Sequence, residues 1–241
     1  MLESLWMKTP AHLKESFAVQ FAVRPLTTDG TKRASEIERD AFPSLKPPTA
    51  FHQELNNKRA NYFVAHARYQ AKRFEPTFAE NRHLINAPPK HMSPLLHTQL
   101  SPTPQPNRHA ISNRNSEVIV GFQGTWYMAD EAHIVTVGVA SDYRGKGIGE
   151  LLLIAALCHA ICRGSIMATL EVRPSNIIAR TLYLKYGFTD RGMRKNYYAD
   201  NREDAIIMTT DHIQSREFRS QLNELRKDHG LRWGWAEIHL K

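Results

Sequence analysis

The chain has 241 residues, of which 41% are hydrophobic, and 32 Lys and Arg against 24 Asp and Glu give a formal charge of +8. This length suffices for one domain with additions, and the basic balance favours a polyanionic partner such as nucleic acid, a ribonucleoprotein or an anionic cofactor. The N-terminus lacks the pattern of a signal peptide, and no apolar run approaches the length of a membrane span. We therefore expect a cytoplasmic protein.

Two cysteines, Cys158 and Cys162, lie four residues apart in an apolar run with helical character. We interpret both as buried helix residues in a reducing compartment rather than as a disulfide or a metal pair. Histidines also occur in the middle of the chain, but none has a partner at a spacing suited to a metal ion. We therefore expect no metal site.

The first part of the chain predicts a strand, two helices and a second strand. Residues 17–26 alternate between apolar and polar positions, and Thr27 or Thr28 can cap a helix that continues to Phe42. Prolines then interrupt the chain before a short helix at 49–56 and a strand at 61–66.

Residues 67–115 differ in kind from the rest. They contain seven prolines and four histidines, few acidic residues and no sustained hydrophobic period. We predict an irregular insertion rather than a second domain. The domain itself is expected to span residues 17–210, with a basic C-terminal extension at 211–241.

The second part of the chain alternates strands with helices. The expected strands are 117–128, 133–139 and 167–172. The expected helices are 149–162 and a segment from Pro174 or Ser175 to Gly187. Residues 188–191 and 204–209 can form a closing antiparallel pair of strands. This order predicts the α/β class, with a mixed sheet and helices on its faces.

One junction points to a ligand. The strand that ends at Val139 is followed by a polar turn and then by three glycines, Gly145, Gly147 and Gly149, which lead into an unbroken apolar helix. Residues without Cβ let the backbone approach a ligand closely, and the free N–H groups of a new helix point at whatever lies there. An anion fits such a place best.

Two linked motifs carry a resemblance to a known family. Arg144-x-x-Gly147-x-Gly149 after a strand resembles the acyl-CoA pyrophosphate loop of the GNAT superfamily of N-acetyltransferases, and N-x-x-A-x-x-L-Y-x-x-x-G-F, from Asn176 to Phe188, resembles its next motif. Three further strings, E-I-E-R-D-A-F-P, L-E-V-R-P-S-N and N-Y-Y-A-D-N-R-E-D-A-I-I-M, resemble the bacterial ribosomal-protein alanine N-acetyltransferases of the RimI type. The matching blocks span roughly residues 20–66 and 117–210. The resemblance implies the GNAT fold, with a mixed, mostly antiparallel sheet, and acetyl-CoA as co-substrate without a metal.

The chemistry of amine acetylation defines the groups that the site needs. A free α-amino group has a pKa of about 7.7–8.0, so a base must take its proton, and a general acid helps the thiolate to leave. The resemblance implies that Glu171 is the general base, directly or through a water, and that Tyr183 is the general acid. From the residues alone, Glu171 could equally lie at an exposed strand edge, and Tyr183 could be an ordinary core tyrosine.

The resemblance also implies the residues that bind acetyl-CoA and the acceptor. Backbone groups of Val137, Gly138 and Val139 would bind the pantetheine arm. The pyrophosphate would lie against the loop formed by Arg144, Gly145, Lys146, Gly147, Ile148, Gly149 and Glu150. Asn176 would contact the cofactor, although it could instead cap its helix. Phe42, His133 and Tyr197 would line the acceptor cleft, and a structural role for His133 stays open.

The acceptor implied by the resemblance is the N-terminal alanine of a ribosomal protein. Lys46 stands where relatives commonly carry a tryptophan, which leaves the first-residue preference open. A small amine is the alternative acceptor, and a non-catalytic acyl-CoA-binding or ribosome-binding module is a further alternative. The basic residues of the insertion and the extension also raise the hypothesis of contact with the ribosome or RNA.

Overall fold

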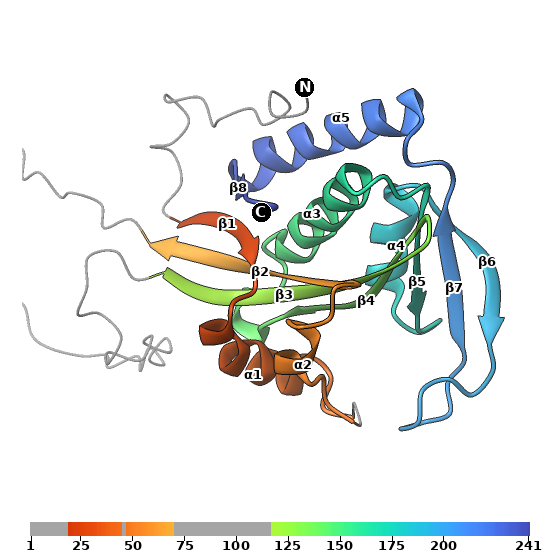
Figure 1. The fold of residues 1–241 in the computed structure, drawn as a ribbon, viewed down its shortest axis with the longest axis horizontal. Helices are drawn as coiled ribbons and strands as arrows, with labels where there is room; N and C mark the ends of the chain where they lie inside the picture. Colours follow the sequence, from red (N-terminus) through yellow and green to blue (C-terminus); the bar gives the residue numbers. More distant parts are fainter. Residues whose placement is uncertain (1–18, 45–46, 70–116) are drawn as a thin grey trace, which may run out of the picture.

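The structure of the chain is a computed structural model that describes residues 19–44, 47–69 and 117–241. Its elements, labelled in Figure 1, are β1 (Val19–Pro25), η3 (Thr28–Gly30), α1 (Thr31–Ala41), α2 (Phe51–Glu54), β2 (Ala60–Tyr69), β3 (Glu117–Met128), β4 (Glu131–Val139), η5 (Ser141–Tyr143), α3 (Ile148–Cys162), β5 (Met167–Val172), α4 (Ile177–Lys185), β6 (Phe188–Arg194), β7 (Ala205–Thr210), α5 (Arg216–Trp233) and β8 (Glu237–Ile238).

The strands form one eight-stranded sheet in the order β6-β7-β5-β4-β3-β2-β1-β8. The pairs β4–β5 and β1–β8 are parallel, and the other neighbours are antiparallel. Figure 1 shows α1 and α2 on one face of the sheet, with α3 and α5 on the other. The predicted α/β class, with a mixed and mostly antiparallel sheet covered on both faces, is confirmed.

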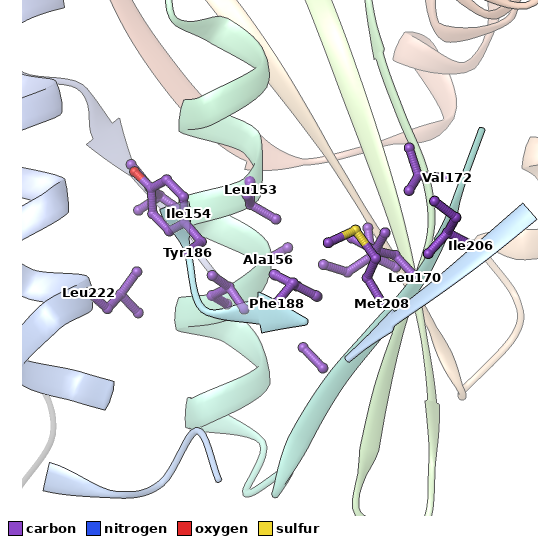
Figure 2. Packing of buried hydrophobic residues seen from close by; sticks show 13 residues of the cluster. Leu153, Ile154, Ala156, Leu170, Val172, Tyr186, Phe188, Ile206, Met208 and Leu222 are labelled. Carbon is purple, nitrogen blue, oxygen red and sulfur yellow. The ribbon is translucent and has the colours of Figure 1, made fainter. Parts of the chain in front are cut away.

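Helix α3 is the centre of the core. Most of its side chains are buried, because the sheet covers one side of it and α5 packs on the other. Figure 2 shows Leu153, Ile154 and Ala156 of α3 in one cluster with Leu170 of β5 and Met208 of β7. Burying a leucine or isoleucine side chain contributes about 1.5–3 kcal/mol. The apolar helix therefore fixes β5, and with it the residues that β5 carries on its opposite face.

The predicted start of the insertion at residue 67 is wrong, because β2 continues to Tyr69. Its last residues pair with the start of β3, where Arg68 lies opposite Glu117. The carboxylate of Glu117 accepts hydrogen bonds from Arg24 at 2.6 Å and Arg68 at 3.3 Å, one from each of two neighbouring strands. These contacts join β1, β2 and β3 at the point where the chain leaves the sheet. Residues 70–116 lie outside the described residues.

The C-terminal residues form part of the same body. Helix α5 begins at Ser215, whose hydroxyl accepts a hydrogen bond from the Phe218 N–H at 3.1 Å. After it, β8 joins the edge of the sheet in parallel with β1. The segment predicted as an extension therefore covers α3 and completes the sheet.

The two cysteines are both free thiols, as the sequence predicts. Cys158 is partly buried against the core, but Cys162 is exposed, so the interpretation of both as buried residues is wrong for Cys162. The reason is its position at the C-terminal end of α3, as the last residue of the helix. No helix in the described ranges is long and apolar enough to span a membrane.

Candidate active site

Strands β4 and β5 diverge in the middle of the sheet. Their parallel pairing ends at Ile134 and Leu170, and the next residues of β5 pair only with β7 on the other side. Along the described part of the chain, no strand pairs with this edge of β4 from Val135 to Val139. Apart from the Val139 carbonyl, which accepts from Arg144 Nε at 3.1 Å, the backbone groups that β4 directs to this edge are open to an extended ligand that binds as an added strand, the arrangement expected for residues 137–139.

Packing accounts for the glycine at the centre of this strand segment. A Cβ at Gly138 would lie 2.6 Å from the ring of Phe122 on β3, so no larger residue fits there. Val137 and Val139 are half-buried and pack against the core beneath α3. Their side chains therefore face the protein, and only their backbone groups can serve a ligand.

The glycine loop follows directly and ends at α3. Gly145 and Gly147 have φ angles of 73° and 74°, in the left-handed region that favours glycine, and a Cβ at Gly145 would meet nothing within 4 Å. The first N–H groups of an α-helix have no partner inside it, so those of Ile148, Gly149 and Glu150 are donors at the positive end of the helix dipole. This geometry suits the diphosphate of CoA.

The two cations of the loop each have partners nearby, Arg144 in β4 and α1 and Lys146 in the turn before the loop. Arg144 donates to the carbonyl of Val139 at 3.1 Å and lies 3.4 Å from the carboxylate of Asp40. Lys146 donates to the carbonyl of Asp142 at 2.9 Å. Both side chains are exposed, so they keep positive charge near the helix N-terminus without being buried.

Glu150 and Asn176 each have a structural partner. The Glu150 carboxylate accepts hydrogen bonds from Lys185 at 2.6 Å and from the Tyr186 hydroxyl at 2.8 Å, so it ties α3 to the end of α4. Only its backbone N–H is directed to the loop. Asn176 caps α4, because its side-chain oxygen accepts from the Ala179 N–H at 3.2 Å. The capping alternative is therefore correct, and a cofactor contact by Asn176 stays a prediction.

Glu171 lies at the point where β4 and β5 diverge, on the face of the sheet opposite α3. His133 of β4 is in register with Thr169, two residues before Glu171 on the same face of β5. This register brings His133 Nε2 to 2.6 Å from Glu171 Oε2. Arg194 of β6 lies 2.9 Å from the other carboxylate oxygen. The carboxylate thus has a partner on each oxygen and is only 7% exposed.

The partners of Glu171 decide its protonation state. Burial raises its pKa, but the hydrogen bond and charge of His133 and the charge of Arg194 outweigh burial, so the pKa is lowered below its usual range. An ionised carboxylate can only accept hydrogen bonds, so His133 donates from Nε2. The geometry rules out the alternative of an exposed strand-edge residue for Glu171.

Tyr183 lies on α4. Its ring packs against Phe188, with 5.8 Å between ring centroids, and it contacts the core cluster of Figure 2. Burial raises the pKa of its hydroxyl to about 12. The hydroxyl therefore stays protonated at neutral pH, as a general acid must before it donates. Packing alone would also account for this position, and the catalytic role stays a prediction.

Two of the residues predicted for the acceptor cleft, Phe42 and Tyr197, lie on loops that contact each other, whereas the third, His133, lies in β4. The hydroxyl of Ser44, after α1, donates to Asp200 in the β6–β7 loop at 2.7 Å. Tyr197 lies in that loop and is 47% exposed, with its ring centre 5.8 Å from the guanidinium of Arg194. Phe42 is half-buried and packs on the cluster beneath α1. Lys46 lies outside the described residues.

Arg173 and Arg194 are the site residues that the sequence analysis missed. Arg173 lies 2.9 Å from Asp200 and 3.1 Å from Glu203, and its guanidinium stacks on the Tyr198 ring at 3.7 Å, so it holds the β6–β7 loop against the end of β5. Both arginines occur within or beside the strings that carry the resemblance. Their partners are too distant in sequence for a spacing pattern to reveal them.

Comparisons with known proteins agree with this geometry. The profile described as the Acetyltransferase (GNAT) family matches residues 80–188. The N-alpha-acetyltransferase RimI of Mycobacterium tuberculosis (strain ATCC 25618 / H37Rv) is 36% identical over 110 residues, which cover 44% of this chain and 68% of that protein. The chain belongs to the GNAT family of acetyltransferases.

Two further relatives are named for the same activity. A Bacillus subtilis (strain 168) protein provisionally named [ribosomal protein bS18]-alanine N-acetyltransferase is 38% identical over 103 residues, 43% of this chain and 68% of the relative. The Escherichia coli (strain K12) protein of that name is 40% identical over 92 residues, 37% of this chain and 62% of the relative. The matched stretch therefore spans less than two thirds of the E. coli protein. The predicted resemblance to GNAT proteins of the RimI type is confirmed.

Solved GNAT structures share the fold. The ribosomal-protein-S18-alanine N-acetyltransferase from E. coli aligns with a TM-score of 0.52 at 23% identity, over 80% of this chain and 94% of that one. A GNAT family acetyltransferase from Elizabethkingia anophelis with acetyl-CoA bound aligns with a TM-score of 0.50 at 18% identity, over 80% and 98%. At these identities the likeness concerns the architecture alone.

Proposed function

We propose that the protein transfers the acetyl group of acetyl-CoA to the N-terminal α-amino group of a protein, and that the acceptor is the N-terminal alanine of a ribosomal protein. The observation that carries the proposal is the position of Glu171. Its carboxylate lies where β4 and β5 diverge, buried and held by His133, on the strand that follows the helix of the glycine loop. The acceptor is supported by the relatives named as [ribosomal protein bS18]-alanine N-acetyltransferases.

The residues fit acetyl-CoA along its length. The free edge of β4 from Val137 to Val139 offers backbone groups to the pantetheine arm, and the helix N-terminus after Gly147 offers N–H donors to the diphosphate. When bound, acetyl-CoA supplies the thioester carbonyl that the amine attacks. Glu171 accepts the proton of the amine, and Tyr183 holds a proton for the departing sulfur.

His133 and Arg194 set the state of the base. His133 donates from Nε2 to Glu171, which keeps the carboxylate ionised and fixes its orientation. The guanidinium of Arg194 occupies the other oxygen, and an incoming ammonium group competes for the same negative charge. The acceptor amine therefore approaches an ionised carboxylate. The side chain of Arg194, which pairs with this carboxylate, is half exposed and can move away.

The two contacting loops support a peptide acceptor. The loop after α1 and the β6–β7 loop meet through Ser44 and Asp200, and Arg173 pins the second loop to the end of β5. They lie beside Tyr197 and Arg194, at the entrance to Glu171. We propose that the first residues of the acceptor bind between these loops.

Contact with the ribosome stays a separate proposal. Arg216 and Arg232 of α5 are exposed, and the insertion adds further basic residues. Co-sedimentation with ribosomes, compared between the full chain and a variant without residues 75–112, tests it. Equal binding and equal peptide kinetics would contradict recruitment by the insertion.

The proposed function is tested with a panel of acceptors. Peptides beginning Ala-Arg or Ser-Arg, the same peptides with a blocked N-terminus, and polyamines are incubated with acetyl-CoA and the full chain. We expect acetylation of the free peptides alone. Acetylation of polyamines instead would assign a small-amine enzyme, and CoA binding without any transfer would assign a binding module.

A further inference from the structure

Helix α5 reaches the glycine loop. Figure 1 shows α5 lying across α3, on the side away from the sheet, with the end of α5 near β8. The profile match ends at residue 188, so this helix lies beyond it. Its last two turns carry His229 and Trp233, and both side chains contact Gly147, the residue that precedes α3.

The contact with His229 is a buried hydrogen bond. His229 Nε2 lies 3.0 Å from the carbonyl oxygen of Gly147, and the side chain is 5% exposed. A carbonyl only accepts hydrogen bonds, so the ring donates from Nε2. Burial lowers the pKa of His229, which keeps the ring neutral and leaves this N–H as its donor.

The contact with Trp233 is steric. A Cβ at Gly147 would lie 2.6 Å from Cγ and Cδ1 of the indole, so the ring packs directly on the glycine backbone. Gly147 already has a left-handed φ of 74°. The glycine is therefore required twice, for its backbone angle and for the close approach of the indole.

The peptide plane between Gly147 and Ile148 is held by two hydrogen bonds to the Gly147 carbonyl. The carbonyl of Gly147 accepts from the Leu151 N–H at 2.9 Å, within the first turn of α3, and from His229 at 3.0 Å. In a trans peptide the C=O and the following N–H point in opposite directions. Two donors on the Gly147 carbonyl thus direct the Ile148 N–H away from α5, to the side on which the anion would lie.

The end of α5 is itself anchored. A Cβ at Gly230 would lie 2.8 Å from the ring of Trp235, so this indole packs on the helix backbone. Beyond it, β8 pairs with β1, and the His239 N–H donates to the Val23 carbonyl at 2.8 Å. The position of His229 is therefore set by the sheet as well as by its own helix.

We propose that α5 forms part of the acetyl-CoA site, with His229 and Trp233 as positioning residues that hold the Gly147–Ile148 peptide for the diphosphate of CoA. The inference rests on the proposed function, since it requires CoA as the ligand. The conformational entropy of this peptide is lost when the protein folds rather than when CoA binds, which favours tighter binding of the anion.

Binding of CoA, followed by calorimetry on the full chain, tests the inference. His229→Leu removes the donor, His229→Gln keeps an N–H at a similar reach, and Leu231→Ala changes an exposed residue of the same helix turn. We expect His229→Leu to weaken CoA binding about tenfold, as loss of one positioned hydrogen bond implies. His229→Gln and Leu231→Ala should stay within about twofold of the parent protein.

Kinetics separate positioning from a purely structural role. For His229→Leu the KM for acetyl-CoA should rise, while kcat at saturating acetyl-CoA and the KM for the peptide stay unchanged. Unchanged CoA affinity in His229→Leu, whatever its thermal stability, would overturn the inference. Equal loss in His229→Gln and His229→Leu would do the same. Absence of CoA binding to the parent protein would overturn the proposed function itself, and the inference with it.

Discussion

His133 Nε2 lies 2.6 Å from Glu171 Oε2, across the line where two parallel strands part. The histidine comes from the last residues of β4 that still pair with β5, and the glutamate from the first residue of β5 that no longer does. The contact therefore joins the stretch where β4 and β5 pair to the stretch where they no longer pair. It places an ionised, oriented carboxylate at the mouth of the site.

Replacing Glu171 with Gln should lower kcat for peptide acetylation by about 10²–10³ at pH 7, within the range for loss of a general base. The loss should be smaller at pH 9, because the acceptor amine is then mostly unprotonated. Rates at saturating acetyl-CoA across this pH range check the prediction, with CoA binding as the control. An equal loss at both pH values would argue for a structural role.

Replacing Arg194 with Met should raise the pKa of Glu171, because a positive charge that favours the carboxylate is removed. A base with a raised pKa loses activity at a higher pH as the solution is acidified. The acid limb of kcat/KM for the peptide should therefore shift upward. An unchanged limb would show that Arg194 does not act on Glu171 in solution.

Replacing Tyr183 with Phe should lower kcat about 100-fold, the lower end of the range for loss of a general acid, while both KM values change little. The phenyl ring keeps the packing against Phe188, so thermal stability should hardly change. A variant with full activity would return Tyr183 to the ordinary role of a core residue. Thermal unfolding measured beside the kinetics distinguishes the two roles.

Replacing Arg173 with Ala should raise the KM for the peptide and leave the KM for acetyl-CoA unchanged. The arginine neutralises Asp200 and Glu203, and without it these carboxylates keep only neutral donors such as the Ser44 hydroxyl and the Ser175 N–H, so the β6–β7 loop should be held less firmly against β5. Hydrogen exchange of residues 197–203 should rise in parallel. A rise in both KM values would indicate a wider disturbance of the fold.

His159 predicts a pH dependence of stability. Burial, and to a lesser degree Arg163, lowers its pKa from 6.5 to about 4, and the Tyr127 hydroxyl lies 2.6 Å from its Nδ1, within hydrogen-bond distance. The unfolded chain then binds the proton first as pH falls, so the free energy of unfolding should decrease between about pH 6.5 and pH 4, by an amount on the order of 3 kcal/mol.

Replacing His159 with Asn, which keeps an acceptor near the Tyr127 hydroxyl, should flatten this dependence. Chemical unfolding at a series of pH values measures it. A parent protein whose free energy of unfolding is constant from pH 7 to pH 4.5 would contradict the assignment of a neutral, buried His159. A variant as acid-sensitive as the parent would place the dependence on another group.

Local patterns in the sequence are enough to predict most elements of the fold. The strand at 117–128 and the strand at 167–172 match β3 and β5 at both ends, because their apolar periods are sharp and turn residues follow them. The helix after Gly147 is one residue longer than predicted. Residues 67–69 could not be assigned to β2, since ion pairs to Glu117, far away in sequence, extend that strand.

The site was predictable only in part for the same reason. The glycine loop and Glu171 lie in short motifs, so they can be found from spacing and resemblance. The contacts of Glu171 with His133 and Arg194, and of Gly147 with His229, join residues that are 23 to 82 positions apart. Such contacts depend on strand register and on how α5 packs, and no local pattern records them.

Transfer of labelled acetyl from acetyl-CoA to a peptide beginning with alanine, compared with the same peptide carrying a blocked N-terminus, tests the central claim most directly. We predict label on the α-amino group of the free peptide, none on the blocked peptide, and a large loss with Glu171→Gln. Label on lysine side chains or on polyamines with the free N-terminus untouched would contradict the account.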